Sequence, residues 1–185
     1  MTNRRETSMM RHPLSLLLPL FALAACQTVQ PQPQQAGFTP QQVATLQQQG
    51  FEPAGDDWQF GMADRLLFGT DESTLIPEQQ AAISRISRVL VAVDIHGARV
   101  EGHTDSTGSA SYNEALSARR AQAVADALVV GGMARQAMRV VGMGARVPVE
   151  SNHLASGRRE NRRVVIIVSP ADASDPVPPA NASLP

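Results

Sequence analysis

The chain has 185 residues, 43% hydrophobic and 18% charged, which suits one folded domain with appended segments. Its formal net charge is −1 and its sixteen basic residues, all arginines, are scattered along the sequence, which argues against nucleic acid as a partner. A single cysteine excludes an intrachain disulfide and any metal site built from several cysteines.

The N-terminal segment combines a charged start with a short apolar run. Three arginines precede residues 14–25, a run shorter than the ~20 residues that a helix needs to span a bilayer, so residues 1–25 are predicted to be a signal peptide. The run ends at Cys26 in a Leu-Ala-Ala-Cys sequence that resembles the bacterial lipoprotein box, in which lipid is attached to the cysteine. Cys26 is therefore the predicted lipidation site. The alternatives are a plain secretory signal cut after Ala25 and a buried helix that holds the cysteine.

The rest of the chain divides into three parts by composition. Residues 26–50 are dominated by glutamine and proline, which predicts a tether after the lipidated cysteine, with a short helix possible over 41–49. Residues 51–169 carry the periodic apolar patterns of a folded domain. Residues 170–185 contain five prolines and no apolar periodicity, which predicts a disordered tail.

Inside the domain, strand patterns alternate with helix patterns. In chain order we predict a strand over 58–68, a helix over 77–93, a strand over 98–103, a helix over 111–130, a strand over 139–142, a short helix over 156–161 and a strand over 163–169. Ser111 and Glu114 have capping-box spacing for the second helix, and Gly131 ends it. This order predicts an α/β (α+β) two-layer sandwich with helices packed on one face of a mixed sheet.

One charge lies on the wrong face of the helix over 111–130. At ~100° per residue, Arg120 falls near the middle of its apolar stripe. A buried guanidinium without a counter-charge costs several kcal/mol, and Asp105, in the loop before this helix, is the obvious partner. Either Asp105 neutralises Arg120 permanently, or the two groups together await a ligand.

Two further polar residues join this pair to form a candidate site. Thr107 and Asn113 lie beside the free amides at the start of the helix, where a carboxylate is favoured. Arg120 can hold a carboxylate through two parallel bonds and Asp105 can accept from an ammonium, so the set suits a zwitterion. The alternative is purely structural: Asp105 caps the helix and Arg120 closes an ion pair.

Catalytic and metal-binding patterns are weak. The sequence has no Gly-x-Ser-x-Gly, the domain has no cysteine, and His103 with Asp105 makes neither a catalytic triad nor a zinc set. We therefore expect no enzymatic activity, no metal and no cofactor.

A longer constellation points to a known family. It comprises Gly102-His103-Thr104-Asp105, Gly108, Tyr112-Asn113, Leu116-Ser117, Arg120-Ala121, Val124, Gly142, Gly144 and Asn161-Arg162-Arg163-Val164. This set, spread over 58–169, resembles the OmpA-like peptidoglycan-binding domain of peptidoglycan-associated lipoproteins.

The resemblance implies a βαβαββ-type fold that binds, non-covalently, the diaminopimelate of the peptidoglycan stem peptide. Asp105 would take the ligand ammonium and Arg120 the carboxylate, with Thr107 and Asn113 as supporting contacts. Asp71 matches a further polar contact, although Gly69 stands where the family frequently has an aspartate.

The expected protein is an outer-membrane lipoprotein, with Gln27 after the cysteine favouring that membrane by the family rule. Its domain would face the periplasm and tether the membrane to the cell wall. The alternative is an envelope module that docks partner proteins, with wall binding secondary. A third hypothesis, with less support in the sequence, is an enzyme that modifies the cell wall.

Overall fold

The computed structural model describes residues 37–63, 67–68 and 72–173. The predicted signal peptide, Cys26 and Asp71 lie outside the described residues, as does the chain after Ala173. No described helix has both the length and the apolar composition needed to cross a bilayer.

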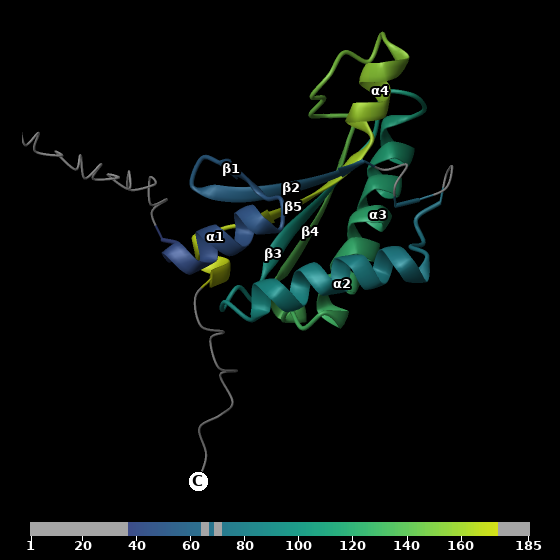
Figure 1. Ribbon diagram of the computed structural model, residues 1–185. Helices are drawn as coiled ribbons and strands as arrows, with labels where there is room; N and C mark the ends of the chain where they lie inside the picture. Colours follow the sequence, from purple (N-terminus) through teal and green to yellow (C-terminus); the bar gives the residue numbers. More distant parts are fainter. Residues whose placement is uncertain (1–36, 64–66, 69–71, 174–185) are drawn as a thin grey trace, which may run out of the picture. The chain divides into compact units, whose positions relative to one another are not determined.

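Helices and strands alternate along the described chain (Figure 1). The elements are α1 (Pro40–Gln48), β1 (Glu52–Ala54), β2 (Asp57–Ala63), α2 (Pro77–Val91), β3 (Ala98–His103), α3 (Ala110–Val130), the 3-10 turn η2 (Arg135–Ala137), β4 (Met138–Gly144), α4 (Ala155–Asn161), β5 (Arg163–Val168) and the 3-10 turn η3 (Pro170–Ala173). From β2 to β5 this is the expected βαβαββ order, with α4 inserted before the last strand.

The five strands form one mixed sheet in the order β1-β2-β5-β3-β4. Among the described strands, only β3 and β4 are parallel; β5 is antiparallel to both of its neighbours, β2 and β3. Consequently β2 and β3 end, and β5 begins, at the same end of the sheet. This is the end where α4 lies in Figure 1.

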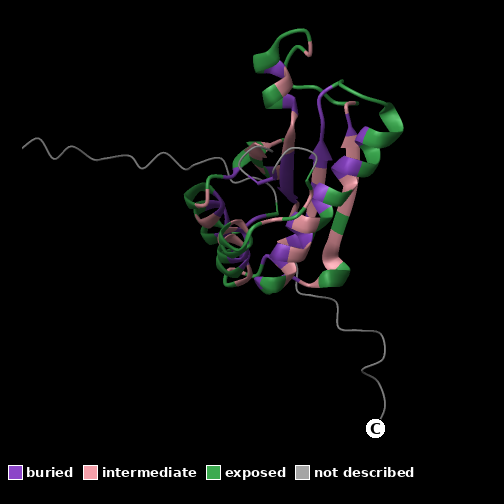
Figure 2. Ribbon diagram, turned by 90° about the vertical axis from the view of Figure 1, so that its right-hand side faces the viewer, coloured by how far each residue is buried: buried purple, intermediate pink, exposed green. Residues whose placement is uncertain are grey.

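The helices pack on one face of this sheet, which confirms the predicted two-layer α+β sandwich. Alternate strand residues, among them Trp58, Val100 and Ile166, belong to one buried cluster with Leu90 of α2 and Leu128 of α3. Figure 2 shows buried residues running along the strands, whereas the loop before α4 is largely exposed. The apolar area removed from water in this layer is the main stabilising term of the fold.

The folded part begins earlier than predicted, because α1 belongs to it. Thr39 caps this helix in a reciprocal box with Gln42, and Pro40 opens its first turn. The side chain of Gln42 also donates to the carbonyl of Val93 at 2.9 Å, and Leu46 is fully buried. The boundary of the predicted tether at residue 50 is therefore wrong; the structured domain already includes α1.

The folded part also extends past residue 169. Asp172 is buried and accepts hydrogen bonds from Arg139 at 2.9 Å and from the backbone N–H of Ser169 at 2.8 Å. The backbone of His96 donates to the Asp172 carbonyl at 2.8 Å. The predicted disordered tail over 170–185 is thus wrong for 170–173, which these bonds hold against β4 and the turn before β3.

Leu46→Ala is expected to lower the free energy of unfolding by about 2–5 kcal/mol, because it empties a fully buried site that joins α1 to the core. Urea unfolding of the full chain measures this change. Gln47→Ala, on the exposed side of the same helix, should change stability by less than about 0.5 kcal/mol. Equal stability of the two variants would show that α1 does not contribute to the fold.

Candidate ligand-binding site at the strand ends

The candidate site lies where β2 and β3 end and β5 begins. The loop from Thr104 to Ser109 connects β3 to the N-terminus of α3 and carries Asp105. Arg162 immediately precedes β5, and the chain after β2 contributes Phe68 and Glu72. The antiparallel pairing of β3 with β5 thus brings together residues that are far apart in the sequence.

Asp105 is buried, and each of its two carboxylate oxygens accepts a hydrogen bond. Its Oδ1 accepts the backbone N–H of Thr107 at 2.8 Å, and its Oδ2 accepts from Nη1 of Arg162 at 2.6 Å. The Asp105 side chain is only 11% exposed, whereas that of Arg162 is 35% exposed. The pair therefore presents its cationic member to solvent and shields most of its anionic member.

The environment of Asp105 keeps its carboxylate ionised. Burial alone would raise its pKa, but the hydrogen bonds from Thr107 and Arg162 and the charge of Arg162 outweigh that effect. The pKa of Asp105 is consequently lowered from its ordinary value. A buried carboxylate that stays charged is suited to pairing with a cation.

Asn113 organises the loop in which Asp105 lies. Its side-chain Nδ2 donates to the carbonyl of Thr107 at 2.9 Å and to that of Asp105 at 3.3 Å. Ser109 caps α3 by accepting the backbone N–H of Tyr112 at 3.2 Å, which corrects the predicted Ser111 capping box. Asn113 is thus buried and stabilises the conformation of the loop, whereas Thr107 in the same loop is exposed.

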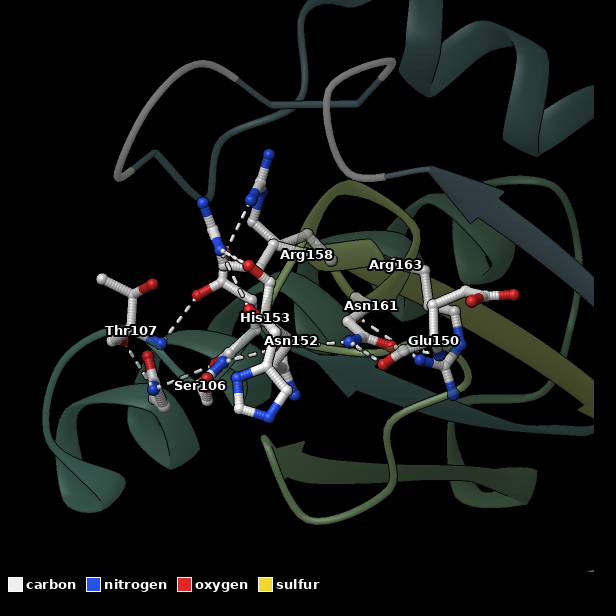
Figure 3. Close-up of polar contacts among 11 residues, drawn as sticks. Ser106, Thr107, Glu150, Asn152, His153, Arg158, Asn161 and Arg163 are labelled. Carbon is white, nitrogen blue, oxygen red and sulfur yellow. Dashed lines mark hydrogen bonds and ion pairs between the residues drawn. The ribbon is translucent and has the colours of Figure 1, made fainter. Parts of the chain in front are cut away.

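A second loop, between β4 and α4, is fastened to the first by asparagines (Figure 3). Asn161 is fully buried; its Oδ1 accepts the N–H of Val149 and of Glu150, and its Nδ2 donates to Asn152 at 3.0 Å. Asn152 in turn accepts the N–H of Ser106 at 3.2 Å. This chain of hydrogen bonds holds the two loops together around Asp105.

Arg120 is buried on α3, as its place on the apolar stripe predicts. Its Nε donates to the carbonyl of Glu72 at 2.8 Å, and its guanidinium carbon lies 5.3 Å from the ring centroid of Phe68. Such a stacked cation gains from the ring's negative face. The chain that follows β2 therefore orients the Arg120 guanidinium.

Of the two alternatives for Asp105 and Arg120, the permanent ion pair between them is wrong. Among residues 37–63, 67–68 and 72–173, no hydrogen bond or ion pair joins these two side chains, and Asp105 pairs with Arg162 instead. Arg162 is part of the family motif, but the sequence pattern predicted no function for it. Its position just before β5 becomes informative only once β5 is known to lie antiparallel to β3.

The chemistry of the site is that of charge recognition. One ionised carboxylate and two arginines lie at the same end of the sheet, with supporting amide and hydroxyl groups from Asn113 and Thr107. In the part of the chain that the structure describes, no three His, Cys, Asp or Glu side chains are grouped to hold a metal ion.

The fold and this site define a class of protein: a two-layer α+β domain that presents acidic and basic side chains at the ends of two strands. The chain belongs to the OmpA family, whose model matches residues 67–162. It is 45% identical to the outer-membrane lipoprotein YfiB of Pseudomonas aeruginosa over 162 residues, covering 85% of this chain and 95% of that protein.

Two further comparisons agree. The chain is 35% identical over 115 residues to the peptidoglycan-associated lipoprotein of Rhizobium meliloti, covering 62% of this chain and 65% of that protein. The solved cell wall anchor of the T6SS from Pseudomonas aeruginosa is 31% identical, with a TM-score of 0.56, covering 70% of this chain and 94% of that one. The predicted resemblance to OmpA-like domains is thereby confirmed.

Proposed function

We propose that this chain is an outer-membrane lipoprotein, anchored through Cys26, whose periplasmic domain binds peptidoglycan non-covalently and so tethers the membrane to the cell wall. Within the wall it recognises the diaminopimelate of the stem peptide. Asp105 receives the ligand ammonium, Arg120 the carboxylate, and Thr107 and Asn113 support the loop between them. The domain acts as a binding module and not as an enzyme.

The observation that carries this proposal is the ionised, mostly buried carboxylate of Asp105. Its lowered pKa and its two hydrogen bonds fix both its charge and its orientation before any ligand arrives. Preorganised charged groups lose little freedom on binding, and each charge-assisted bond contributes roughly 1.5–3 kcal/mol. Arg162 then has the role of holding Asp105 in place.

The relatives support the same assignment. The YfiB relative is named an outer-membrane lipoprotein and covers most of this chain, and another relative is named peptidoglycan-associated. The Leu-Ala-Ala-Cys sequence ending at Cys26 suits a lipid anchor. A domain held to lipid at one end and to a polymer at the other gains from effective concentration, because each weak contact keeps the next one close.

Asp105→Ala combined with Arg120→Ala is expected to abolish retention of the full chain on isolated peptidoglycan. The double variant removes both charges that the ligand's two ends require. Co-sedimentation with peptidoglycan sacculi, followed by quantification of the bound fraction, measures the effect.

A matched control removes one acid and one arginine elsewhere. Asp126 and Arg135 form an exposed ion pair at 3.0 Å, and their double alanine variant should be retained like the original chain. Peptidoglycan whose stem peptide carries lysine in place of diaminopimelate lacks one carboxylate and should retain the original chain less. Equal retention of both double variants on diaminopimelate-type wall would refute the proposed site.

A further inference from the structure

The sheet has a groove whose lining includes none of the residues assigned to wall binding. The groove has a volume of about 590 Å³ and follows β2 and β5, with the loop after β4 and the end of α4 at its rim. Val165 and Ile167, which alternate with the core residues of β5, line it, and the exposed side chains of Val147 and Val149 border it. It is therefore a trough on the sheet whose lining combines apolar side chains with polar and charged ones.

One side of this groove is an unpaired strand edge. Strand β1 pairs with β2 only from Asp57 to Gln59, whereas β2 continues to Ala63. From Phe60 onward, the only described strand that pairs with β2 is β5. An open strand edge carries unused backbone donors and acceptors and is a template for another strand.

The turn between β1 and β2 determines which backbone groups face that edge. It is a two-residue turn with Gly55 first at a φ of +66°, as a type II′ hairpin requires. Such a turn makes Ala54 and Asp57 a hydrogen-bonded pair, and the direction of backbone groups then alternates along β2. The N–H and C=O groups of Gly61 and Ala63 consequently point to the open side.

Gly61 itself indicates a close approach at this edge. A Cβ built at Gly61 would meet nothing within 4 Å, so internal packing does not require glycine here. Glycine in the middle of a strand frequently marks a place where another backbone comes near.

The groove also contains His103, which is 3% exposed and whose ring nitrogens make no hydrogen bond to a described residue.

The charges around the groove indicate what kind of segment fits. Glu52 and Glu160 are exposed at its rim, and neither forms an ion pair with a described residue. The third lining carboxylate, Glu101, is already paired with Arg99, and the lining also contains one arginine, Arg163. The lining therefore carries an excess of negative charge, which favours a basic partner.

We propose that the open edge of β2 captures one extended segment of a partner protein by strand addition, a segment that carries both apolar and basic side chains on its groove-facing side. Main-chain bonds to Gly61 and Ala63 supply register. Every second side chain of the segment enters the groove, the apolar ones against Val165 and Ile167 and the basic ones toward Glu52 and Glu160. The chain's own ends fit this chemistry poorly: residues 27–36 and 174–185 contain prolines and no basic residue.

Fluorescence anisotropy tests the proposal on the full chain, with a labelled eight-residue peptide that carries arginine, valine, valine and arginine at its odd positions and threonine at its even positions. Gly61→Pro removes the outward N–H on an edge where proline is tolerated, and should weaken binding more than about tenfold. Gly61→Ala keeps that N–H and should bind within about threefold of the original. A peptide with glutamate in place of both arginines should also bind more weakly.

Each outcome decides the proposal. Equal binding by the proline and alanine variants, or no binding of the valine–arginine peptide to the original chain, overturns it. If Gly61→Pro fails to fold by circular dichroism, Glu52→Gln with Glu160→Gln must still weaken binding of the basic peptide. If the original chain sediments as a dimer and the Gly61→Pro variant as a monomer, the occupant of the edge is a second copy of this chain. That result would overturn the assignment to a partner protein. Retention on peptidoglycan should be the same for Gly61→Pro and the original chain, which separates this inference from the proposed wall binding.

Discussion

The free energy of unfolding of this chain is expected to fall by on the order of 3 kcal/mol between pH 6.5 and pH 4 because of His103 alone. Burial, assisted by the nearby charge of Arg163, lowers the pKa of His103 from 6.5 to about 4. The unfolded chain therefore binds more protons than the folded chain in this window, so stability rises with pH. The loss begins as pH falls below 6.5 and is complete near pH 4.

The acid beside His103 does not reverse this effect. Nε2 of His103 lies 3.4 Å from Glu101, which would favour the imidazolium, but Glu101 is also paired with Arg99. His103 is 3% exposed, so its protonation places a charge where water cannot solvate it. Desolvation is the larger influence, and the folded domain keeps His103 neutral.

Urea unfolding at several pH values between 7 and 4.5 measures the effect, and His103→Gln should flatten much of the slope. His153→Gln provides the control, because His153 is exposed in the loop before α4 and should leave the slope unchanged. Asp105 contributes to stability in a lower pH range. Because its pKa is lowered in the folded chain, this contribution is present above about pH 3.9 and is lost as pH falls below that value. An identical slope for His103→Gln and the original chain would contradict the assignment.

The parts of the fold that depend on local pattern were predictable. The periodic apolar residues of α3 and the strand over 98–103 lie within one residue of their predicted bounds. The stripe also placed Arg120 in the buried face, where it lies. Short-range periodicity determines these features, and no knowledge of distant contacts is needed.

The parts of the fold that depend on contacts between distant segments could not be predicted from the sequence. The short helix allowed over 41–49 is present as α1, but its place in the folded domain was not predicted. This glutamine-rich helix is stable in the fold because Leu46 packs into a core built from other segments. Likewise, the pairing of Asp105 with Arg162 follows from the antiparallel register of β3 with β5, where His103 lies opposite Arg163. Sequence spacing across 57 positions carries no such information.

Helix capping shows a third kind of limit. Ser109 and Ser111 both precede the apolar stripe of α3, and both satisfy the chemistry of an N-cap. The structure uses Ser109, whose Oγ lies 3.4 Å from that of Ser111. The hydrogen bonds of Asn113 reach back six and eight residues to the loop carbonyls, beyond the spacing that a capping pattern considers, and they favour the start of the helix at Ser109.

Gly102→Ala is expected to destabilise the domain by about 3 kcal/mol or more, at the upper end of what overpacking costs. A Cβ at Gly102 would lie 2.0 Å from the backbone oxygen of Ser117 and 2.7 Å from its carbonyl carbon. Because the obstacle is helix backbone and not the end of a flexible side chain, α3 must move away from β3 as a unit. Gly142 on β4 meets the same helix closely, with a Cβ 2.6 Å from the carbonyl oxygen of Glu114.

The displacement should also weaken wall binding, since α3 carries Arg120 and Asn113 while β3 leads directly to Asp105. Gly61→Ala is the matched control: it makes the same substitution in a strand with nothing within 4 Å, and should change stability by less than about 1 kcal/mol. Chemical unfolding and co-sedimentation with peptidoglycan measure the two effects. A Gly102→Ala variant as stable as Gly61→Ala would mean that α3 tolerates a shift. Close contact between this helix and β3 would then not be what positions the site.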